Sequence, residues 1–321
     1  MLRRIVGKAI AWSLQDEIQL AAGPLQMSSG LKGGAEAAIH AMRTVFEADN
    51  TDAVILVDAS NSFDRLKRKA ALHNIQYICP PFALSLINTY REPARLFIVG
   101  GEEITSSEGT AQGDPLAMQF YTLGTSPLIH ILKCKVPSVS QVWLADDATG
   151  AAGKLHNLKD WWDLVIKEGN KLGYHVNASK SWLILKKSEE MQLAKEIFKE
   201  SDINITTSGK RHLGSALGSK EFQTQYIQEK VSKWCDEINN LAEIAKTQPH
   251  AAYSAYMHGQ QHKYRYFMHT ISGLQEHLKP LDDAITNILV QAITGFGNIS
   301  ELERELLSLP VSSGGMGALK W

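Results

Sequence analysis

The sequence predicts an α+β fold in which a sheet carries helices on one face and a helical domain follows. Up to about Ser219, short apolar runs typical of strands alternate with segments of helix length. From Glu221 onward, long helical patterns replace the strand signals, so we place a domain boundary near Ser219. The chain has 321 residues, 44% hydrophobic and 21% charged, which is enough for one main and one smaller domain.

Two amphipathic helices are predicted before the first strand, because apolar residues recur there at helical spacing. The two sets are Leu2, Ile5, Val6, Ala9 and Ile10, and Ala38, Ile39, Met42, Val45 and Phe46. A Gly-rich loop at residues 28–34 separates them. It could cradle a phosphate or simply connect the helices, and the connector is favoured because the loop lacks the Walker pattern and follows no predicted strand.

Two apolar runs deliver acidic residues at their ends. Residues 53–57 are typical of a buried strand that ends at Asp58, and a second run ends at Asp146 and Asp147, just before a turn. Neighbouring residues of a strand point to opposite faces, so Asp146 and Asp147 are equivalent only if the turn re-aims one of them. Clustered carboxylates repel one another, and divalent metal is therefore the predicted partner.

Between these acidic runs the sequence predicts helices, a hairpin and a glycine loop. A short helix follows residues 61–64, Pro80-Pro81 opens another, and residues 95–105 form a β-hairpin around Gly100-Gly101. The loop at residues 108–115 then starts a largely apolar helix.

After the second acidic run we expect a helix whose Trp161 and Trp162 belong to the core, ended by Gly173. An apolar strand at residues 182–185 and a shorter one near residues 212–214 complete the sheet region.

Charge and cysteine usage narrow the class of protein. The formal net charge is −1 and the pI about 6.8, which counts against tight autonomous binding of nucleic acid. Cys79, Cys134 and Cys235 are widely spaced, with no CxxC pair, so neither a disulfide framework nor structural zinc is expected. With no signal peptide and no apolar run of membrane-spanning length, we expect an intracellular protein of cytoplasm or nucleus, not secreted and without a membrane partner.

The order and spacing of these motifs resemble a reverse transcriptase, an RNA-directed DNA polymerase, of a non-LTR retrotransposon. Residues 57–64 (VDASNSFD) are similar to the first palm motif, 109–116 (GTAQGDPL) to the second and 144–147 (LADD) to the third. The QGDPL string is the most specific of these.

Further matches extend the resemblance over nearly the whole chain. Residues 172–177 with Lys180 are similar to the fourth motif, 212–214 (HLG) to the start of the primer grip, and 309–317 to the segment after the thumb. The resemblance implies a right-hand polymerase fold whose palm sheet is antiparallel, with partial fingers at 1–50, the palm at 51–219 and a helical thumb and connection at 220–321.

The resemblance also implies two-metal catalysis. Asp58, Asp146 and Asp147 are the expected catalytic residues, and with the Ala59 carbonyl they would hold two Mg²⁺ ions, with Mn²⁺ as an alternative. Asp147 is given the weaker, partly indirect role. A metal site with few protein ligands and no His suits magnesium, which keeps substrate phosphates in its shell.

For the substrate, the resemblance implies nucleotide contacts from Ala59, Phe63, Gln112, Gly113 and Lys180. The Phe63 ring would clash with a 2′-hydroxyl, which favours deoxynucleoside triphosphates, although it could also be an aromatic below the sheet. Gln112 and Gly113 would contact the incoming nucleotide, and Lys180 would reach the leaving phosphates or donate a proton unless it is only solvated surface. RNA or DNA template with a primer is the expected partner, and protein partners are not indicated.

Some features depart from the pattern. Leu144 stands where Tyr or Phe usually precedes Ala-Asp-Asp, and the chain opens inside what resembles the end of the first finger motif, so the triphosphate-binding finger strands are expected to be missing. Asp64 and Asp114 fit helix caps at least as well as catalytic groups. The alternative function is therefore a decayed or domesticated palm that binds nucleic acid or protein without catalysis; a palm-fold cyclase is disfavoured by the QGDPL string and the helical C-terminal part.

Overall fold

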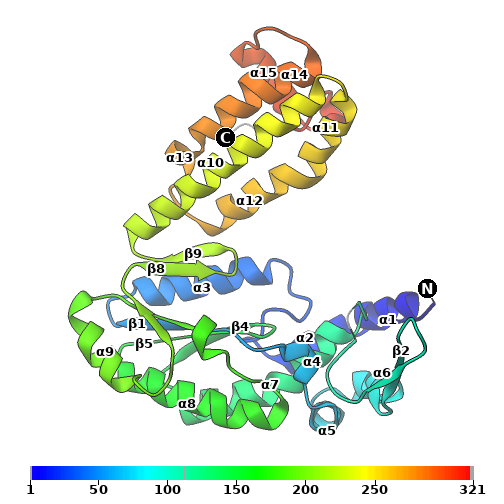
Figure 1. Cartoon of the computed structure of the whole chain (residues 1–321), viewed down its shortest axis with the longest axis vertical. Coiled ribbons are helices and arrows are strands. Elements are labelled where there is room, and N and C mark those ends of the chain that lie inside the picture. Colours follow the sequence, from blue (N-terminus) through cyan, green and yellow to red (C-terminus); the bar gives the residue numbers. More distant parts are fainter. Residues whose placement is uncertain (1, 112, 319–321) are drawn as a thin grey trace. The chain divides into compact units, whose positions relative to one another are not determined.

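The computed structural model describes residues 2–111 and 113–318, and the chain divides into two compact units, Met1–Leu213 and Gly214–Trp321. Figure 1 shows all strands but β9 in the first unit and long helices in the second. The predicted α+β class with a mainly antiparallel sheet is confirmed. The division falls a few residues before Ser219, in the turn between β8 (Gly209–His212) and β9 (Ser215–Gly218).

The sheet of the first unit has five strands in the order β4-β5-β1-β6-β7. Their bounds are Ser140–Leu144, Asp147–Ala152, Ala53–Val57, Trp182–Leu185 and Asn204–Thr206. All neighbours are antiparallel except β6 and β7. The central strand β1 is buried at every position except the half-buried Leu56, which confirms the buried strand predicted there.

Helices lie on both faces of the sheet, whereas the sequence predicted them on one face, because the helix at residues 34–47 also packs on the strands. Helices α7 (Ala117–Lys135) and α8 (Leu155–Leu172) contact each other, and α8 contacts β1 and β5. Helix α3 (Gly34–Glu47) contacts β4 and β5 and lies on the other side of the sheet in Figure 1. Gly173 ends α8 in the left-handed conformation, as predicted.

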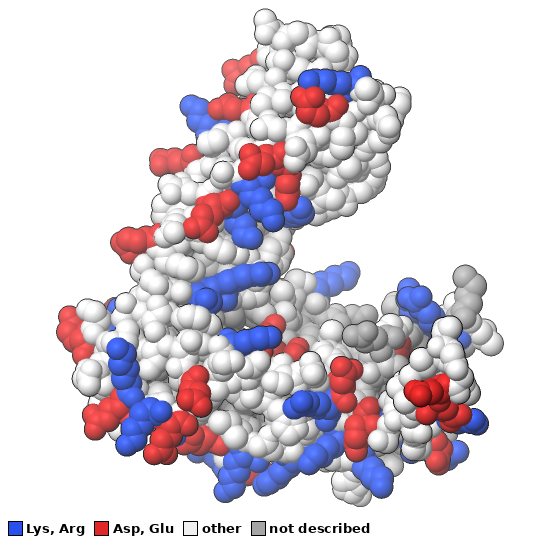
Figure 2. Space-filling view, viewed as in Figure 1, with Lys and Arg blue, Asp and Glu red and all other residues white. Residues whose placement is uncertain are grey.

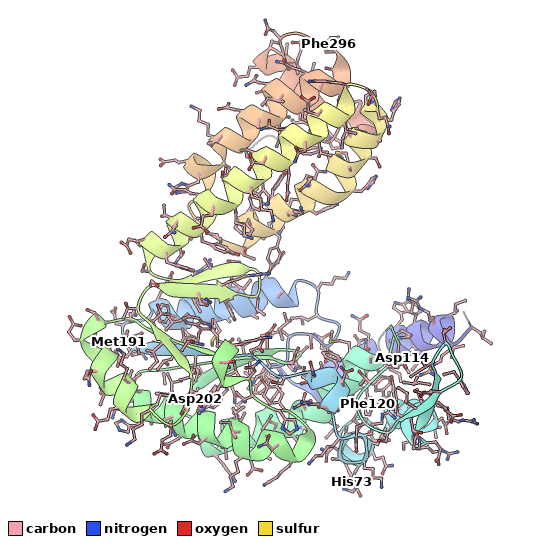
Figure 3. All side chains as sticks on the ribbon, in the orientation of Figure 1. His73, Asp114, Phe120, Met191, Asp202 and Phe296 are labelled. Carbon is pink, nitrogen blue, oxygen red and sulfur yellow. The ribbon has the colours of Figure 1, made fainter. Side chains whose placement is uncertain are left out.

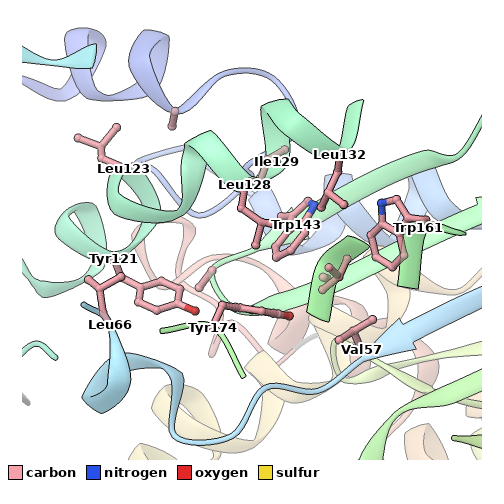
Figure 4. Packing of buried hydrophobic residues seen from close by; sticks show 14 of the residues in the cluster. Val57, Leu66, Tyr121, Leu123, Leu128, Ile129, Leu132, Trp143, Trp161 and Tyr174 are labelled. Carbon is pink, nitrogen blue, oxygen red and sulfur yellow. The ribbon is translucent and has the colours of Figure 1, made fainter. Parts of the chain in front are cut away.

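Aromatic side chains form much of the core between the sheet and α8. The rings of Trp143 and Trp161 have centroids 6.4 Å apart, and those of Trp143 and Tyr174 are 5.4 Å apart. Figure 4 shows these rings with Tyr121 of α7 in the same layer. Trp161 and Trp162 are both fully buried, so the prediction that this pair belongs to the core is confirmed.

The remaining elements of the first unit lie before and between the strands. They are α1 (Leu2–Ser13), α2 (Gln15–Ala22), α4 (Ser62–Arg65), α5 (Arg68–Ile78), α6 (Pro80–Tyr90), the hairpin β2 (Ala94–Phe97) and β3 (Glu103–Ser106), η1 (Ala178–Lys180), η2 (Ser188–Glu190) and α9 (Met191–Ile197). The helix opened by the proline pair and the hairpin are confirmed. The helix predicted from the apolar residues between Leu2 and Ile10 is confirmed as α1, although Leu2, Ile5 and Val6 are exposed and only Gly7 is fully buried.

The second unit is helical and has its own core, in which Trp234 packs on Tyr264 and Phe267. After β9, its elements are α10 (Lys220–Ala245), α11 (Pro249–Ala255), η3 (Tyr256–Gln260), α12 (Gln261–Thr270), α13 (Gln275–Ala284), η4 (Ile285–Val290), α14 (Gln291–Thr294), α15 (Glu301–Ser308) and η5 (Val311–Ser313). The side chain of Ser219 caps α10 by accepting a hydrogen bond from the Phe222 N–H.

Surface charge is mixed. Figure 2 shows acidic and basic side chains interspersed over the visible face, in keeping with the net charge of −1. Among the described residues, no helix combines the length and the apolar character needed to span a membrane.

Candidate active site

A two-residue turn, Ala145-Asp146, carries the acidic pair. Leu144 and Asp147 are register partners, so only these two residues lie between β4 and β5. Ala145 has a φ of 56°, in the left-handed region, as tight hairpin turns require. Asp146 therefore projects from the turn while Asp147 begins the strand, and the two carboxylates are not equivalent.

Three side chains hold this turn. The Tyr174 hydroxyl donates to the Asp146 carbonyl at 2.8 Å, and the Ser62 hydroxyl donates to a carboxylate oxygen of Asp146. The Gln26 amide bonds to both backbone polar groups of Ala145. Tyr174, Ser62 and Gln26 come from three distant parts of the sequence, so the position of Asp146 depends on tertiary contacts among these segments.

Asp58 is fixed by the strand end on which it lies. The segment from Asp58 runs antiparallel to residues 175–177, with Ala59 bridged to Val176. The Asn177 N–H donates to the Asp58 carbonyl at 2.8 Å, and the Asp58 N–H donates to the Ser181 hydroxyl at 3.1 Å. The resemblance placed residues 172–177 and Lys180 in a motif of their own, and the fold brings that motif beside Asp58.

One pocket brings together acidic and basic side chains of the site. Its lining includes Asp58, Asp147, Lys180, Lys210 and Arg211. Asp58 and Asp147 come from the ends of neighbouring strands of the sheet, whereas Lys210 and Arg211 come from β8. The pocket can therefore receive both a cation on its carboxylates and an anion on its basic groups.

The buried histidine of β8 also lines this pocket. His212 Nε2 lies 3.0 Å from the Thr149 hydroxyl, which ties β8 to β5 two residues after Asp147. Burial, with a smaller effect of Arg43, lowers the pKa of His212 to about 4, so its imidazole is neutral at physiological pH.

Asp58, Asp146 and Asp147 form an acidic group in which the negative charges repel one another. Desolvation, then the charges of Asp146 and Asp58, raise the pKa of Asp147 to about 6, against an opposing effect of Arg211. Desolvation also raises the pKa of Asp58; Lys180 opposes that shift and Asp146 adds to it. The Asp147 side chain is exposed at the pocket, so a bound cation could reach it and relieve the repulsion.

The three carboxylates are electrostatic neighbours without forming a closed metal cage. Within residues 2–111 and 113–318, no three or more His, Cys, Asp or Glu side chains gather closely enough to hold a metal by themselves. Mg²⁺ is usually held by one or two carboxylates plus substrate phosphates. The donor set of Asp58, Asp146 and Asp147 fits that arrangement better than a preformed structural site.

Phe63 packs on Tyr121, whose ring lies near Asp146. Its ring stacks on Tyr121, with centroids 4.3 Å apart and an interplanar angle of 20°. Burial raises the pKa of Tyr121 well above its usual value, with a further contribution from Asp146, so the Tyr121 ring lies within the field of that carboxylate. Phe63 is half-buried and, like Ala59, is not part of the described pocket lining.

The glycine loop of the second motif packs against the first motif. The Gly109 N–H donates to the Leu66 carbonyl and the Thr110 N–H to the Phe63 carbonyl, both at 2.8 Å. A Cβ on Gly109 would lie 2.3 Å from the Asp64 carbonyl oxygen, so this close approach requires glycine. Gly113 has a φ of 79° in an exposed turn and does not line the pocket, while Gln112 lies outside the described residues.

Asp114 is a structural residue in this fold. Its carboxylate accepts hydrogen bonds from the Tyr90 hydroxyl at 2.6 Å, from Arg3 at 2.7 Å and from the Leu116 N–H at 3.0 Å. Figure 3 shows it where the chain enters α7, a short distance before Phe120. The interpretation of Asp114 as a residue that helps start a helix is thus supported.

Asp64 does not cap the helix that follows it. It lies inside α4, and Lys67 occupies the N-cap position of α5. The first N–H of α5, on Arg68, instead donates to the Glu108 carboxylate at 2.7 Å. The cap predicted for Asp64 is therefore supplied by a residue of the glycine loop.

Several residues of the site carry no local sequence signal. Gln26 lies in the turn before a glycine-rich connector, and Lys210 and Arg211 lie in a segment without a motif, far along the chain from the acidic residues. Buried Arg68 is another: its guanidinium donates to the carbonyls of Gly109 and Ser106 and so shapes the glycine loop. Ser62 is the exception, since it lies inside the first motif.

Comparison with known proteins supports the fold alone. No protein-family model matches the chain, and no curated protein matches its sequence. Telomerase from Candida albicans, solved with a TWJ fragment of telomeric RNA, is similar with a TM-score of 0.50 at 10% identity, over 94% of this chain and 54% of that one. The Candida tropicalis enzyme, also solved with a TWJ fragment of telomeric RNA, gives 0.50 at 12% identity, over 93% and 52%.

This chain thus spans about half the length of the telomerase chains it matches. It shares their reverse-transcriptase-like polymerase fold.

Proposed function

We propose that the chain is a reverse-transcriptase-like nucleotidyltransferase of retrotransposon origin, which adds deoxynucleotides to a primer on an RNA or DNA template. The observation that carries the proposal is the pocket that Asp58 and Asp147 line together with Lys180 and Arg211, with the charge of Asp146 acting on both carboxylates. A fold related to telomerase supports it.

Two divalent ions, Mg²⁺ or Mn²⁺, fit the donor set, which consists of carboxylate oxygens whose mutual repulsion a cation would relieve. Asp58 and Asp146 would hold them, with Asp147 and the Ala59 carbonyl assisting. When bound, such ions activate the primer hydroxyl and neutralise charge on the transferring and leaving phosphates.

The protein's own groups would then position the substrate. Lys180, Lys210 and Arg211 line the pocket that contains Asp58, and they would attract the triphosphate. Phe63, fixed by its stack on Tyr121, would limit space near the sugar and favour deoxynucleotides. Gln112 and Gly113 would contact the nucleotide from the glycine loop, whose register depends on Gly109 and Arg68.

A second candidate function is binding without catalysis. It is favoured by Leu144, which stands beside the turn in place of the usual aromatic, and by the balanced surface charge, which gives little general attraction to nucleic acid. Under this alternative the fold and the turn persist while turnover has been lost.

Primer extension distinguishes the two. Purified chain is given labelled primer on RNA and on DNA template, with deoxynucleotides and either Mg²⁺ or Mn²⁺. Extension is expected with the wild type and should fall to background in Asp146→Ala/Asp147→Ala. Asp163→Ala, which removes an exposed carboxylate paired with Lys159 on α8, is the matched control and should extend like the wild type.

Extension that persists at the wild-type level in the purified double variant would overturn the site assignment. No extension by the wild type with either metal, together with retained binding of the template, would establish the non-catalytic alternative.

A further inference from the structure

We infer that Gln26 is a positioning residue that holds Ala145 in its left-handed conformation and thereby aims the Asp146 carboxylate. This inference rests on the proposed function for its effect on catalysis, but the contact itself does not depend on that function.

The contact is a two-point clamp. Gln26 Oε1 accepts from the Ala145 N–H at 2.9 Å, and Gln26 Nε2 donates to the Ala145 carbonyl at 3.1 Å. The Gln26 side chain thereby satisfies both backbone groups of one residue across 119 positions of sequence. The Ser28 hydroxyl donates to the same Oε1 at 2.8 Å, which fixes the orientation of the amide.

The backbone around Gln26 is equally constrained. The Trp143 N–H donates to the Leu25 carbonyl at 2.8 Å, and the Met27 N–H donates to the Trp143 carbonyl at 2.7 Å. Residues 25–27 thus lie along β4 like a short additional strand, with a bridge between Gln26 and Trp143. Gln26 is 4% exposed, so water does not compete for its amide.

Ala145 has a backbone conformation that is unfavourable without stabilising contacts. Ala145 has a side chain, yet its φ of 56° lies in a region that residues other than glycine rarely adopt because Cβ crowds the carbonyl oxygen. Hydrogen bonds to both its N–H and its carbonyl oppose rotation of either flanking peptide. Since Asp146 follows immediately, rotation of the peptide that joins them would swing the Asp146 side chain away from Asp58.

Gln26 bonds to Ala145 and Ser28 rather than to an acidic side chain, so its role is positioning. Through this contact the segment before the glycine-rich connector fixes the backbone of Ala145, while Ser62 and Tyr174 contact Asp146 directly.

The test uses the full chain with alanine methyl groups labelled with ¹³C. The resonance lost in Ala145→Gly identifies Ala145, and its shift reports the backbone conformation there. In Gln26→Ala this resonance should move toward the shift of an ordinary turn. In Gln15→Ala it should stay in place, because Gln15 donates one bond to the Gly30 carbonyl and is the matched control.

Primer extension gives the second readout. Gln26→Ala should lower kcat at least tenfold with less than a threefold change in KM for the nucleotide, because Asp146 is misplaced and the basic pocket is intact. Adding Ala145→Gly should restore kcat at least threefold, since glycine reaches positive φ without the steric cost. Gln15→Ala should keep both constants.

An Ala145 resonance that does not move in Gln26→Ala overturns the inference whether or not the chain is active. If it moves while kcat is unchanged, the clamp exists but does not aim Asp146, and the inference is again wrong. If the wild type shows no extension, the proposed function fails, and a moved resonance still establishes the clamp on its own.

Discussion

Asp147 and Asp114 lie in the same unit, but their surroundings shift the pKa values of the two carboxyl groups in opposite directions. Desolvation and two neighbouring carboxylates raise the pKa of Asp147 to about 6. Burial acts on Asp114 in the same direction, but hydrogen bonds from Tyr90, Leu116 and Arg3 outweigh it and leave the pKa of Asp114 below its usual value. Asp114, which serves the fold, is surrounded by hydrogen-bond donors, whereas Asp147, the proposed cation ligand, lies among like charges.

The difference shows how an aspartate of the proposed active site can be told from an aspartate that stabilises the fold when both lie in polymerase-like motifs. Both residues belong to strings that resemble polymerase motifs, so the motifs alone do not distinguish them. The polar neighbours do: Asp114 has three donors within 3.0 Å, and Asp147 has Asp146 and Asp58. Four predictions test this contrast.

The largest effect is expected at Asp114. Asp114→Ala should lower the free energy of unfolding by about 2–3 kcal/mol, because it leaves the buried Tyr90 hydroxyl without its acceptor and removes the bond that orders the entry to α7. Urea unfolding followed by circular dichroism measures the loss. Exposed Asp64→Ala is the control; equal losses for the two variants would mean that Asp114 is not structural.

A divalent metal should stabilise the protein by binding at Asp58 and Asp147 and not at Asp114. At ten times its dissociation constant, Mg²⁺ or Mn²⁺ should raise the free energy of unfolding by roughly 1.4 kcal/mol, because it binds the folded state alone. The gain should disappear in Asp58→Asn/Asp147→Asn and persist in Asp163→Asn, as thermal unfolding with and without metal would show. A gain that survives the loss of Asp58 and Asp147 would place the metal elsewhere.

Removing one charge of the acidic group should stabilise the metal-free protein. Asp147→Asn is expected to raise the free energy of unfolding by about 0.5 kcal/mol at pH 7.5, a small value because the side chain is exposed. Primer extension by the same variant should fall, so stability and function would move in opposite directions. A destabilised Asp147→Asn would show that repulsion is not what raises the pKa of Asp147.

The smallest effect is a pH dependence of that gain. The folded state of the wild type binds the Asp147 proton more tightly than the unfolded state, so the wild type gains stability as pH falls from about 6 toward 3.8. The advantage of Asp147→Asn should therefore be complete above pH 6 and vanish near pH 4, in urea unfolding repeated across this range. For Asp114 the sign is reversed, because its lowered pKa gives stability at neutral pH that acid removes.

Much of the fold was accessible from sequence because its signals are local. The apolar run of β1, the glycine that ends α8 and the proline pair that opens α6 each act over a few residues. The apolar stripe of α1 predicted the helix for the same reason, but helical spacing does not say which of its side chains a partner surface covers, and Leu2, Ile5 and Val6 are exposed.

The residues that position the acidic side chains or line the pocket beside them could not be predicted from the sequence in the same way. Asp58, Asp146 and Asp147 stand at strand ends that the pattern marks. Gln26 bonds to a residue 119 positions away, and no spacing rule announces such a bond. Lys210 and Arg211 reach the pocket only through the position of β8, which depends on tertiary packing.

The central place of β1 also bears on how the protein folds. Strand β1 pairs with β5 and β6, whose residues lie about 90 to 130 positions farther along the chain. Closing such long loops is slow, because chain entropy is lost before the contacts form. During synthesis, β1 must therefore wait unpaired until Ala152 and then Leu185 have left the ribosome. The acidic group is thus a late product of folding, and a nascent chain that stops earlier has no site to assemble.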